Sequence, residues 1–312
     1  MKQEQIYLPQ YKEYLAIKGY ATTTIETFSK AADYFIKWIT GQNISLEQVS
    51  YNDVLAFINY KKKQGNKPRT IQLFINSLNR FFIYLVDEHQ FNENPASNVI
   101  IKGVKRKTLY EILSPEELET IYKTYKTEII YAADKKIPPQ GSKELARKRN
   151  KVLLGLLVYQ GIKPEEICKI ELTDLQLREG KITIQSSLKT NSRTLKLESH
   201  QVFDLYDYIN QTRKQILINT KKESTKLFIS IGESHLYSNL LQKLTKTLKK
   251  NNPKIKTLKH IRTSVITNWL KVHNLRKTQY MAGHRYVSST EAYQINNIEE
   301  LQDDIKKYHP IG

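Results

Sequence analysis

Residues 282–293 read AGHRYVSSTEAY, in which a tyrosine follows a Gly-His pair nine positions after the histidine. Gly283 can end a helix in the left-handed conformation that glycine tolerates, and any residue of the Ser-Ser-Thr run at 288–290 can cap the next helix. A phenol such as that of Tyr293 is a poor nucleophile at neutral pH, so it needs a cationic pocket around its target. On spacing alone, the stretch is more typical of a helix–turn–helix with local hydrogen bonds.

Composition narrows the class of protein. The chain has 312 residues, a net charge of +19 and a pI of about 9.6, which indicates about two domains and a polyanionic partner. Nucleic acid is favoured over a membrane surface because no lipidation motif is present. Residues 243–259 carry seven lysines and no acidic residue. No apolar run could cross a bilayer and no apolar signal core is found at the N-terminus, so we expect a cytoplasmic protein.

The single cysteine, Cys168, excludes an internal disulfide and a cysteine-cluster zinc site.

The first part of the chain has the periodicity of a small helical bundle. The expected helices are 5–19, 22–40, 51–64 and one that begins at Pro68. Arg69 lies at the start of this last helix, where it could meet a phosphate. We predict a helical DNA-binding domain over residues 1–96.

A basic linker is expected over residues 97–112, between Asn94-Pro95 and the next helix start. Its cations suit a segment that crosses a DNA backbone. They are Lys102, Lys105, Arg106 and Lys107.

A second domain is expected over residues 113–312. Ser114-Pro115-Glu116-Glu117 has the pattern of a capping box with proline at the first helical position. The alternating segments 181–184 and 193–197 predict a β-hairpin. The expected helices are 143–160, one that starts at Pro164, 200–219, 234–250, 259–273 and 275–282, with a surface loop at 132–142 and an amphipathic tail from 298.

The stretch 282–293 resembles the last sequence box of the tyrosine recombinase (phage integrase-like) family, with its Gly-His, threonine and nucleophilic tyrosine in register. The pattern from Arg69-Thr70-Ile71 to Asn94-Pro95-Ala96 is similar to the core-binding domain of that family. The resemblance implies a mainly α fold with a small β-hairpin or sheet. It pairs an N-terminal helical, SAM-like core-binding domain with a tyrosine recombinase catalytic domain.

The first catalytic box of the family has an arginine followed by an acid three positions later, and here these positions hold Lys163 and Glu166. Lysine is a point charge and cannot grip two phosphate oxygens as arginine does. Lys163 could do the work less well, Arg147 or Arg149 could replace it, or the site could be impaired. The plain alternative is a lysine without a role at a helix start.

The resemblance assigns the remaining boxes residue by residue. Lys189, in the hairpin turn and followed by Arg193, matches the lysine that protonates the leaving 5′ oxygen, and Arg193 is expected to bind DNA. Lys259 and Arg262 match a His-x-x-Arg pair that holds the phosphate, and three residues along a helix place both on one face. A register shifted to His260 would leave no arginine at the right distance.

The implied reaction begins when Tyr293 attacks a DNA phosphodiester to form a 3′-phosphotyrosine. Arg262, His284, Lys259 and Lys163 stabilise the charge on phosphorus. The pocket needs no metal and no nucleotide cofactor. The expected partner is a double-stranded DNA recombination site, bound by four copies of the chain on two duplexes, and the free chain is expected to be a monomer or dimer with no membrane association.

Three functions stay open. The first is a recombinase or integrase of a mobile element. The second is a catalytically weakened relative that binds recombination sites as a regulatory or structural partner, which Lys163 favours. The third is a topoisomerase that uses the same covalent chemistry as a monomer.

Overall fold

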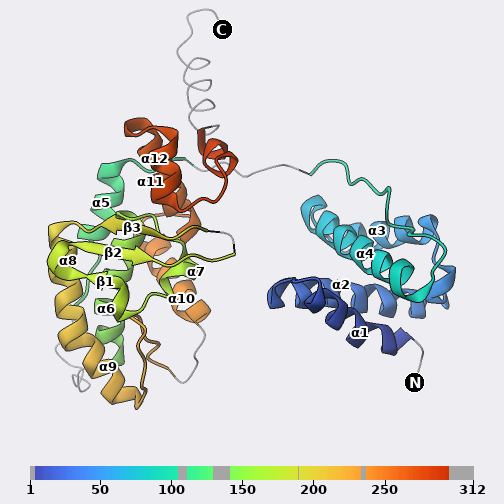
Figure 1. Ribbon diagram of the computed structural model, residues 1–312, viewed down its shortest axis with the longest axis horizontal. Coiled ribbons are helices and arrows are strands. Elements are labelled where there is room, and N and C mark those ends of the chain that lie inside the picture. The colour runs from blue at the N-terminus through green and yellow to red at the C-terminus, as the bar shows by residue number, and fades with distance from the viewer. Residues whose placement is uncertain (1–3, 105–110, 129–140, 189, 233–236, 295–312) are drawn as a thin grey trace, which may run out of the picture. The chain divides into compact units, whose positions relative to one another are not determined.

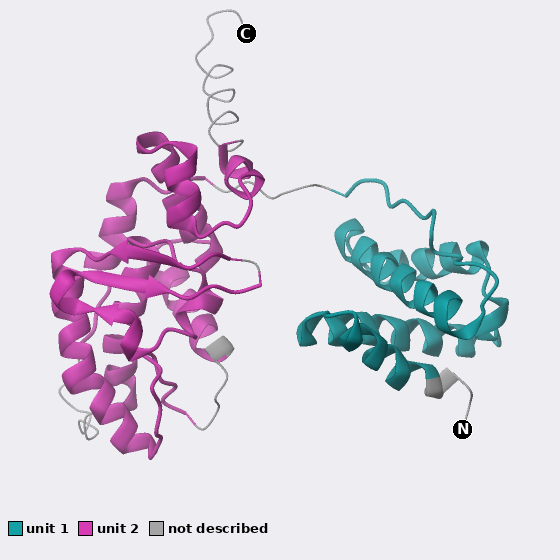
Figure 2. Ribbon diagram, in the orientation of Figure 1, with its two compact units in different colours: residues 1–108 teal, residues 109–312 magenta. Residues whose placement is uncertain are grey.

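The structure is a computed structural model of the chain and describes residues 4–104, 111–128, 141–188, 190–232 and 237–294 (Figure 1). The chain divides into two compact units, Met1–Thr108 and Leu109–Gly312 (Figure 2). The boundary lies within the stretch predicted as a linker, and the finer limits of the two domains stay predictions.

The first unit is helical. Its elements are α1 (Glu4–Ile17), α2 (Thr22–Gly41), the 3₁₀ turn η1 (Leu46–Gln48), α3 (Tyr51–Lys63) and α4 (Pro68–His89). Phe35 of α2 packs edge-on against Phe57 of α3 and Phe82 of α4, with ring centroids 5.0 and 5.8 Å apart. All three rings are buried, so the helices share one aromatic core.

The second unit combines helices with a small sheet. Its elements are α5 (Pro115–Lys123), α6 (Ser142–Val158), α7 (Pro164–Ile167), η2 (Leu172–Asp174), β1 (Leu175–Gln176), η3 (Leu177–Glu179), β2 (Lys181–Ile184), β3 (Arg193–Lys196), α8 (Ser199–Asp207), the π-helical turn η4 (Tyr208–Thr212), α9 (Arg213–Thr220), α10 (Tyr237–Asn251), α11 (Leu258–Val272) and α12 (Leu275–Ala282). A further helix covers 288–294. The prediction of a mainly helical chain with a small sheet is confirmed.

The sheet has the order β1-β2-β3 with antiparallel neighbours. In the predicted hairpin, Ile182 faces Leu195 and Ile184 faces Arg193. All four side chains are buried, so the inward face of β3 carries one charged residue among apolar ones. Strand β1 was not predicted because its two residues are too few to show alternation.

Helix α6 is the centre of the second core. Every residue from 152 to 158 is buried, which is typical of a helix that is apolar on all sides. It packs against α5, α8 and α11. None of the described helices combines the length and apolarity needed to cross a membrane.

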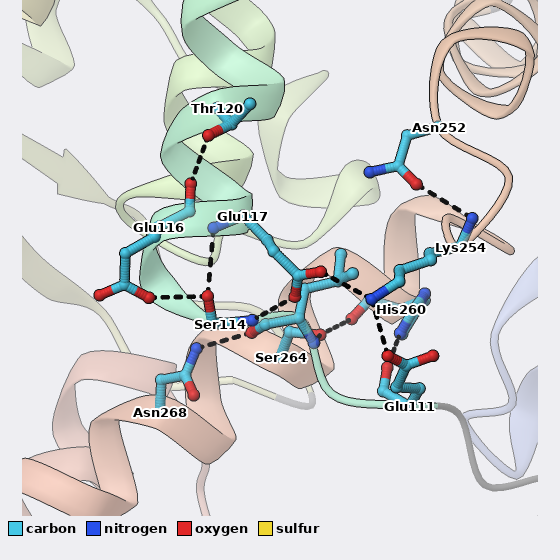
Figure 3. A network of polar contacts seen from close by, with 11 residues as sticks. Glu111, Ser114, Glu116, Glu117, Thr120, Asn252, Lys254, His260, Ser264 and Asn268 are labelled. Carbon is cyan, nitrogen blue, oxygen red and sulfur yellow. Dashed lines mark hydrogen bonds and ion pairs between the residues drawn. The ribbon is translucent and has the colours of Figure 1, made fainter.

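The start of the second unit is fastened to α11 by the polar network in Figure 3. The Leu113 N–H donates to Ser264 Oγ at 3.0 Å, and Asn268 Nδ2 donates to the Leu113 carbonyl at 2.9 Å. His260 Nε2 lies 2.7 Å from the Glu111 carbonyl oxygen, and Lys254 bridges the carboxylates of Glu111 and Glu117. Segment 111–117 is therefore tied to the helix that carries Arg262.

The predicted capping box is present at the same point: Ser114 Oγ accepts from the Glu117 N–H at 3.2 Å, and the Glu117 carboxylate accepts from the Ser114 N–H at 2.9 Å. Two expected features, the surface loop at 132–142 and the tail from 298, lie wholly or largely outside the described residues.

Candidate active site

Arg262 is the buried centre of the candidate site. Thr257 caps α11 by accepting the His260 N–H at 3.0 Å, which sets the start of the helix one turn before Arg262. Arg262 is 3% exposed, and its guanidinium donates to the carbonyls of Gly161 and Ala282. A buried guanidinium needs such partners, and these two hold it between the loop before α7 and the end of α12.

His284 lies directly beside this guanidinium. Gly283 ends α12 with φ of +66°, as predicted, and turns the chain so that His284 is buried. Its Nε2 is 3.3 Å from Arg262 Nη2 and its Nδ1 is 2.9 Å from Thr290 Oγ1. Burial, the largest cause, and the positive charges of Arg262, Lys163 and Arg193 together lower the pKa of His284 to about 4. The free imidazole is therefore neutral at physiological pH.

Tyr293 completes the cluster from the helix 288–294. Its ring stacks on His284, with centroids 5.6 Å apart and planes 18° apart. Burial lowers the pKa of Arg262, and an electrostatic interaction with Tyr293 and a hydrogen bond that Arg262 donates to Tyr293 are among the effects that oppose this lowering. The predicted nucleophile, the histidine and the arginine are thus in mutual contact.

The predicted cap of the tyrosine helix is wrong. Val287 occupies the capping position, because its carbonyl accepts the N–H groups of Thr290 and Glu291 at 2.7 and 3.0 Å. The Ser-Ser-Thr run lies in the first turn instead. The Thr290 side chain points to His284, so its hydroxyl serves the site rather than the helix end.

Glu166 and Arg193 form a buried pair under the cluster. Arg193 Nη1 and Nη2 donate to Glu166 Oε1 and Oε2 at 3.0 and 2.8 Å, and Glu166 Oε2 also accepts the Lys163 N–H at 3.0 Å. Burial raises the pKa of Glu166, but the hydrogen bonds and charge of Arg193 outweigh it, so the net pKa is lowered. The carboxylate is therefore ionised and fixes both residues.

Arg193 corrects one prediction. It was expected to bind DNA, but its side chain is 0% exposed and both of its terminal nitrogens donate to Glu166. It also packs against Gly283, where an added Cβ would lie 2.4 Å from Arg193 Nη1. Arg193 therefore supports the turn that presents His284. Its place two residues before Leu195, on the same buried face of the predicted strand, is the signal that could have revealed this.

Lys163 is the cation at the position where the family has arginine. Burial lowers the pKa of its ammonium group first, and the positive charge of Arg262 lowers it further. The two alternatives are engaged elsewhere: Arg149 donates to the Ile229 carbonyl at 2.8 Å and Arg147 to the Glu128 carbonyl at 2.6 Å. Of the three candidate cations, Lys163 is therefore the one that lies close to Arg262.

The two neighbouring basic residues of α11 lie in different environments. Lys259, the predicted partner of Arg262, is exposed, whereas His260 is 1% exposed and faces Glu111 in the network of Figure 3. His260 is therefore an anchor of the chain, and the register that places Lys259 and Arg262 together stays a prediction.

The turn end of the β2–β3 hairpin lies against His284. Thr190 forms a β-bridge with His284, and the Asn191 N–H donates to the Gly283 carbonyl at 3.2 Å. Lys189 lies outside the described residues, as do the predicted DNA contacts Lys105, Arg106 and Lys107. Lys102 and Arg69 are exposed.

Sequence reasoning did not find the structural roles of Gly161 or Thr190. Gly161 has φ of +54° and supplies a carbonyl to Arg262. The Gln160-Gly161 pair at a helix end was a usable signal for such a turn. The bridge between Thr190 and His284 is a long-range contact that no local pattern predicts.

Comparison with known proteins supports one family across most of the chain. The sequence profile of the phage integrase family matches residues 111–300, and that of the phage integrase N-terminal SAM-like domain matches residues 8–89. The chain is 26% identical to the tyrosine recombinase XerC of Bacillus subtilis (strain 168), covering 99% of this chain and 98% of that protein. It is 25% identical to the tyrosine recombinase XerD of Listeria innocua serovar 6a, covering 94% of each.

Solved structures share the fold. The XerH site-specific recombinase bound to palindromic difH substrate, a post-cleavage complex, superposes with a TM-score of 0.68 at 18% identity, covering 95% of this chain and 83% of that chain. The Tn1549 transposon integrase in complex with a circular intermediate DNA gives a TM-score of 0.64 at 16% identity, covering 92% and 94%. The fold, the arginine–histidine–tyrosine cluster and the profile matches agree, and the chain belongs to the phage integrase family of tyrosine recombinases.

Proposed function

We propose that this chain is a site-specific DNA recombinase that breaks and rejoins strands through a covalent bond between Tyr293 and a DNA phosphate. The observation that carries the proposal is the contact of Tyr293 with His284 and Arg262. A phenol that lies against a guanidinium and an imidazole has the electrophilic surroundings that its attack on phosphorus needs.

The charge of the pocket supports an anionic substrate. Lys163, Arg193 and Arg262 surround a single buried carboxylate, Glu166, which leaves an excess of positive charge. Repulsion among these cations contributes to the lowered pKa of Lys163 and of His284. A bound phosphate would reverse this repulsion, so the pocket is prepared for an anion.

The proposed reaction is a transesterification. The Tyr293 oxygen forms a bond to phosphorus as the bond from phosphorus to the 5′ oxygen breaks, which leaves a 3′-phosphotyrosine and a free 5′ hydroxyl. The phenol loses one proton and the 5′ oxygen gains one, so the proton count is unchanged. Arg262, His284, Lys163 and Lys259 would stabilise the charge that develops on the phosphate oxygens. A 5′ hydroxyl of the partner strand then reverses the step.

Lys189 is proposed to give its proton to the leaving 5′ oxygen. Support comes from its sequence neighbour Thr190, which pairs with His284 and so brings that end of the hairpin turn to the cluster.

The proposed partner is a duplex recombination site, with four copies of the chain on two duplexes. XerH was solved bound to difH substrate and the Tn1549 integrase with a circular intermediate DNA, and the net charge of +19 suits a DNA-bound protein. We propose that Lys102, Lys105, Arg106, Lys107 and Arg69 contact the DNA backbone. We also propose that the recombinase acts for a mobile genetic element and is located in the cytoplasm.

A nicked suicide substrate tests the function. The nick lets a short fragment diffuse away after cleavage and traps the covalent complex, so the wild-type chain should give a protein–DNA adduct that survives denaturation. Tyr293→Phe removes only the hydroxyl and should abolish the adduct while DNA binding persists. An adduct of undiminished yield from Tyr293→Phe would exclude this nucleophile.

A second candidate function is favoured by one residue. Lys163 lacks the planar fork of arginine, which fits a relative that binds recombination sites with weakened catalysis. The same experiment separates the two: such a protein binds the duplex specifically and forms no adduct.

A further inference from the structure

We propose that Thr290 is a positioning residue that allows neutral His284 to exchange its tautomer when phosphate enters the site. The inference rests on the proposed function and names a residue and a step within it. It is carried by the two hydrogen-bond partners of His284 and by what each can donate or accept.

The first partner fixes the tautomer of the free protein. Arg262 Nη2 lies 3.3 Å from His284 Nε2, and a guanidinium has N–H donors and no acceptor. Nε2 must therefore accept, because an N–H there would face another N–H. The proton of the neutral ring is on Nδ1, from which it is donated to Thr290 Oγ1 over 2.9 Å.

Phosphate requires the opposite arrangement. Its non-bridging oxygens only accept, so a ring nitrogen that turns from Arg262 to phosphate must carry a hydrogen. For neutral His284 this moves the proton from Nδ1 to Nε2 and leaves Nδ1 as an acceptor. A partner that can only accept would then face a bare lone pair.

Thr290 fits both states because a hydroxyl can donate or accept. Its side chain is 0% exposed, and within the described residues its Oγ1 has His284 as its hydrogen-bonding partner. In the free state the hydroxyl accepts, and the part of the chain that the structure describes offers its own hydrogen no acceptor. In the phosphate-bound state it donates to Nδ1 and that hydrogen is satisfied, which favours the change.

The charged groups around the ring disfavour the alternative, in which His284 gains a second proton. Arg262, Lys163 and Arg193 face it, against one carboxylate, Glu166. Exchange of the proton between the two ring nitrogens adds no charge to this cationic pocket.

The test compares Thr290→Val with Thr290→Ser. Valine keeps the shape and removes the hydroxyl, serine keeps the hydroxyl, and Ser289→Ala is the control on a neighbouring exposed hydroxyl. With a nicked substrate, we expect adduct formation to slow roughly tenfold in Thr290→Val, and to stay within about threefold of wild type in the other two. Equal rates in Thr290→Val and wild type would overturn the proposal.

Nitrogen-15 resonances of labelled histidine supply a readout that a purely structural role would not move. The free protein should show His284 protonated on Nδ1, and saturating orthovanadate should move the proton to Nε2 in wild type and in Thr290→Ser only. A free ring protonated on Nε2, or a vanadate response in Thr290→Val identical to wild type, would refute it. The free-protein measurement uses no DNA, so failure of the proposed recombination is seen separately as a missing adduct.

Discussion

Two structural features require glycine at position 283. Its φ of +66° is in the left-handed region, and an added Cβ would lie 2.4 Å from Arg193 Nη1. The first requirement is common to glycines that end helices. The second couples the turn before His284 to the buried Arg193–Glu166 pair, so the site depends on a contact that spans three sequence segments.

Gly283→Ala should therefore cost more than its matched control Gly180→Ala. Gly180 also has positive φ, but an added Cβ there has its nearest neighbours at 3.9 Å. We expect about 1–2 kcal/mol of destabilisation for the control from backbone strain alone and a larger loss for Gly283→Ala, measured by denaturant unfolding. Equal losses would mean that Arg193 moves aside without penalty.

Lys163 is predicted to work at the phosphate. Lys163→Arg should keep or raise the rate of adduct formation, by up to about tenfold, because a bidentate donor would replace a point charge. Gel quantification of adduct against time measures this rate, with Lys169→Arg, a nearby exposed lysine, as the control. A severe loss in Lys163→Arg alone would indicate a pocket rebuilt around lysine.

The low pKa of His284 makes stability depend on pH. The pKa is about 4 in the folded chain, against an ordinary value of 6.5, so between these values the unfolded chain binds more protons. The free energy of unfolding should therefore fall as pH is lowered from about 6.5 toward 4, and His284→Gln should flatten part of this slope. Thermal unfolding across this pH range checks it, and an unchanged slope in His284→Gln would contradict the assignment.

At the scale of elements, the sequence predicted the helices and turns that carry the candidate site residues. It predicted less well the buried contacts that hold those residues in place. Helical spacing located α11 and α12, and the glycine rule located the turn between α12 and His284. Arg193 was misread because its role arises from a partner far along the chain: Glu166 lies 27 positions from Arg193. Thr290 was read as a possible helix cap, whereas its side chain bonds to His284, six positions away across the turn. Burial of a charged strand residue depends on tertiary contacts that no local pattern contains.

Helix α11 carries one residue expected to act in stability and a neighbour expected to act in catalysis, so two substitutions can test these roles separately. His260→Ala should destabilise the chain by about 1–3 kcal/mol, because the buried ring and its bond to the Glu111 carbonyl are lost. The neighbouring exposed Lys259→Ala should leave stability within about 0.5 kcal/mol of wild type and slow adduct formation. Calorimetry and the suicide-substrate assay read the two effects, and the reverse pattern would show that the two residues had been assigned in the wrong register.

At the scale of the whole molecule, the basic charge, the two units and the cluster of Arg262, His284 and Tyr293 are consistent with one function. The charge predicts a polyanion, the profile matches extend over both units, and the cluster places the proposed nucleophile among cations. Composition could predict a polyanionic partner, and the resemblance of the motifs could predict the family. The contacts of Arg262 with Gly161 and Ala282 join segments 101 and 20 positions apart and needed the fold.

The most direct measurement of the central claim is mass-spectrometric mapping of the residue that becomes linked to DNA. The suicide-substrate adduct is digested with trypsin and nuclease, and the peptide that carries a nucleotide is fragmented. Cleavage after Arg285 gives a peptide that contains both Tyr286 and Tyr293, so the exposed Tyr286 is an internal control. The account predicts a 3′-linked nucleotide on Tyr293 and none on Tyr286; a nucleotide on any other residue would contradict it.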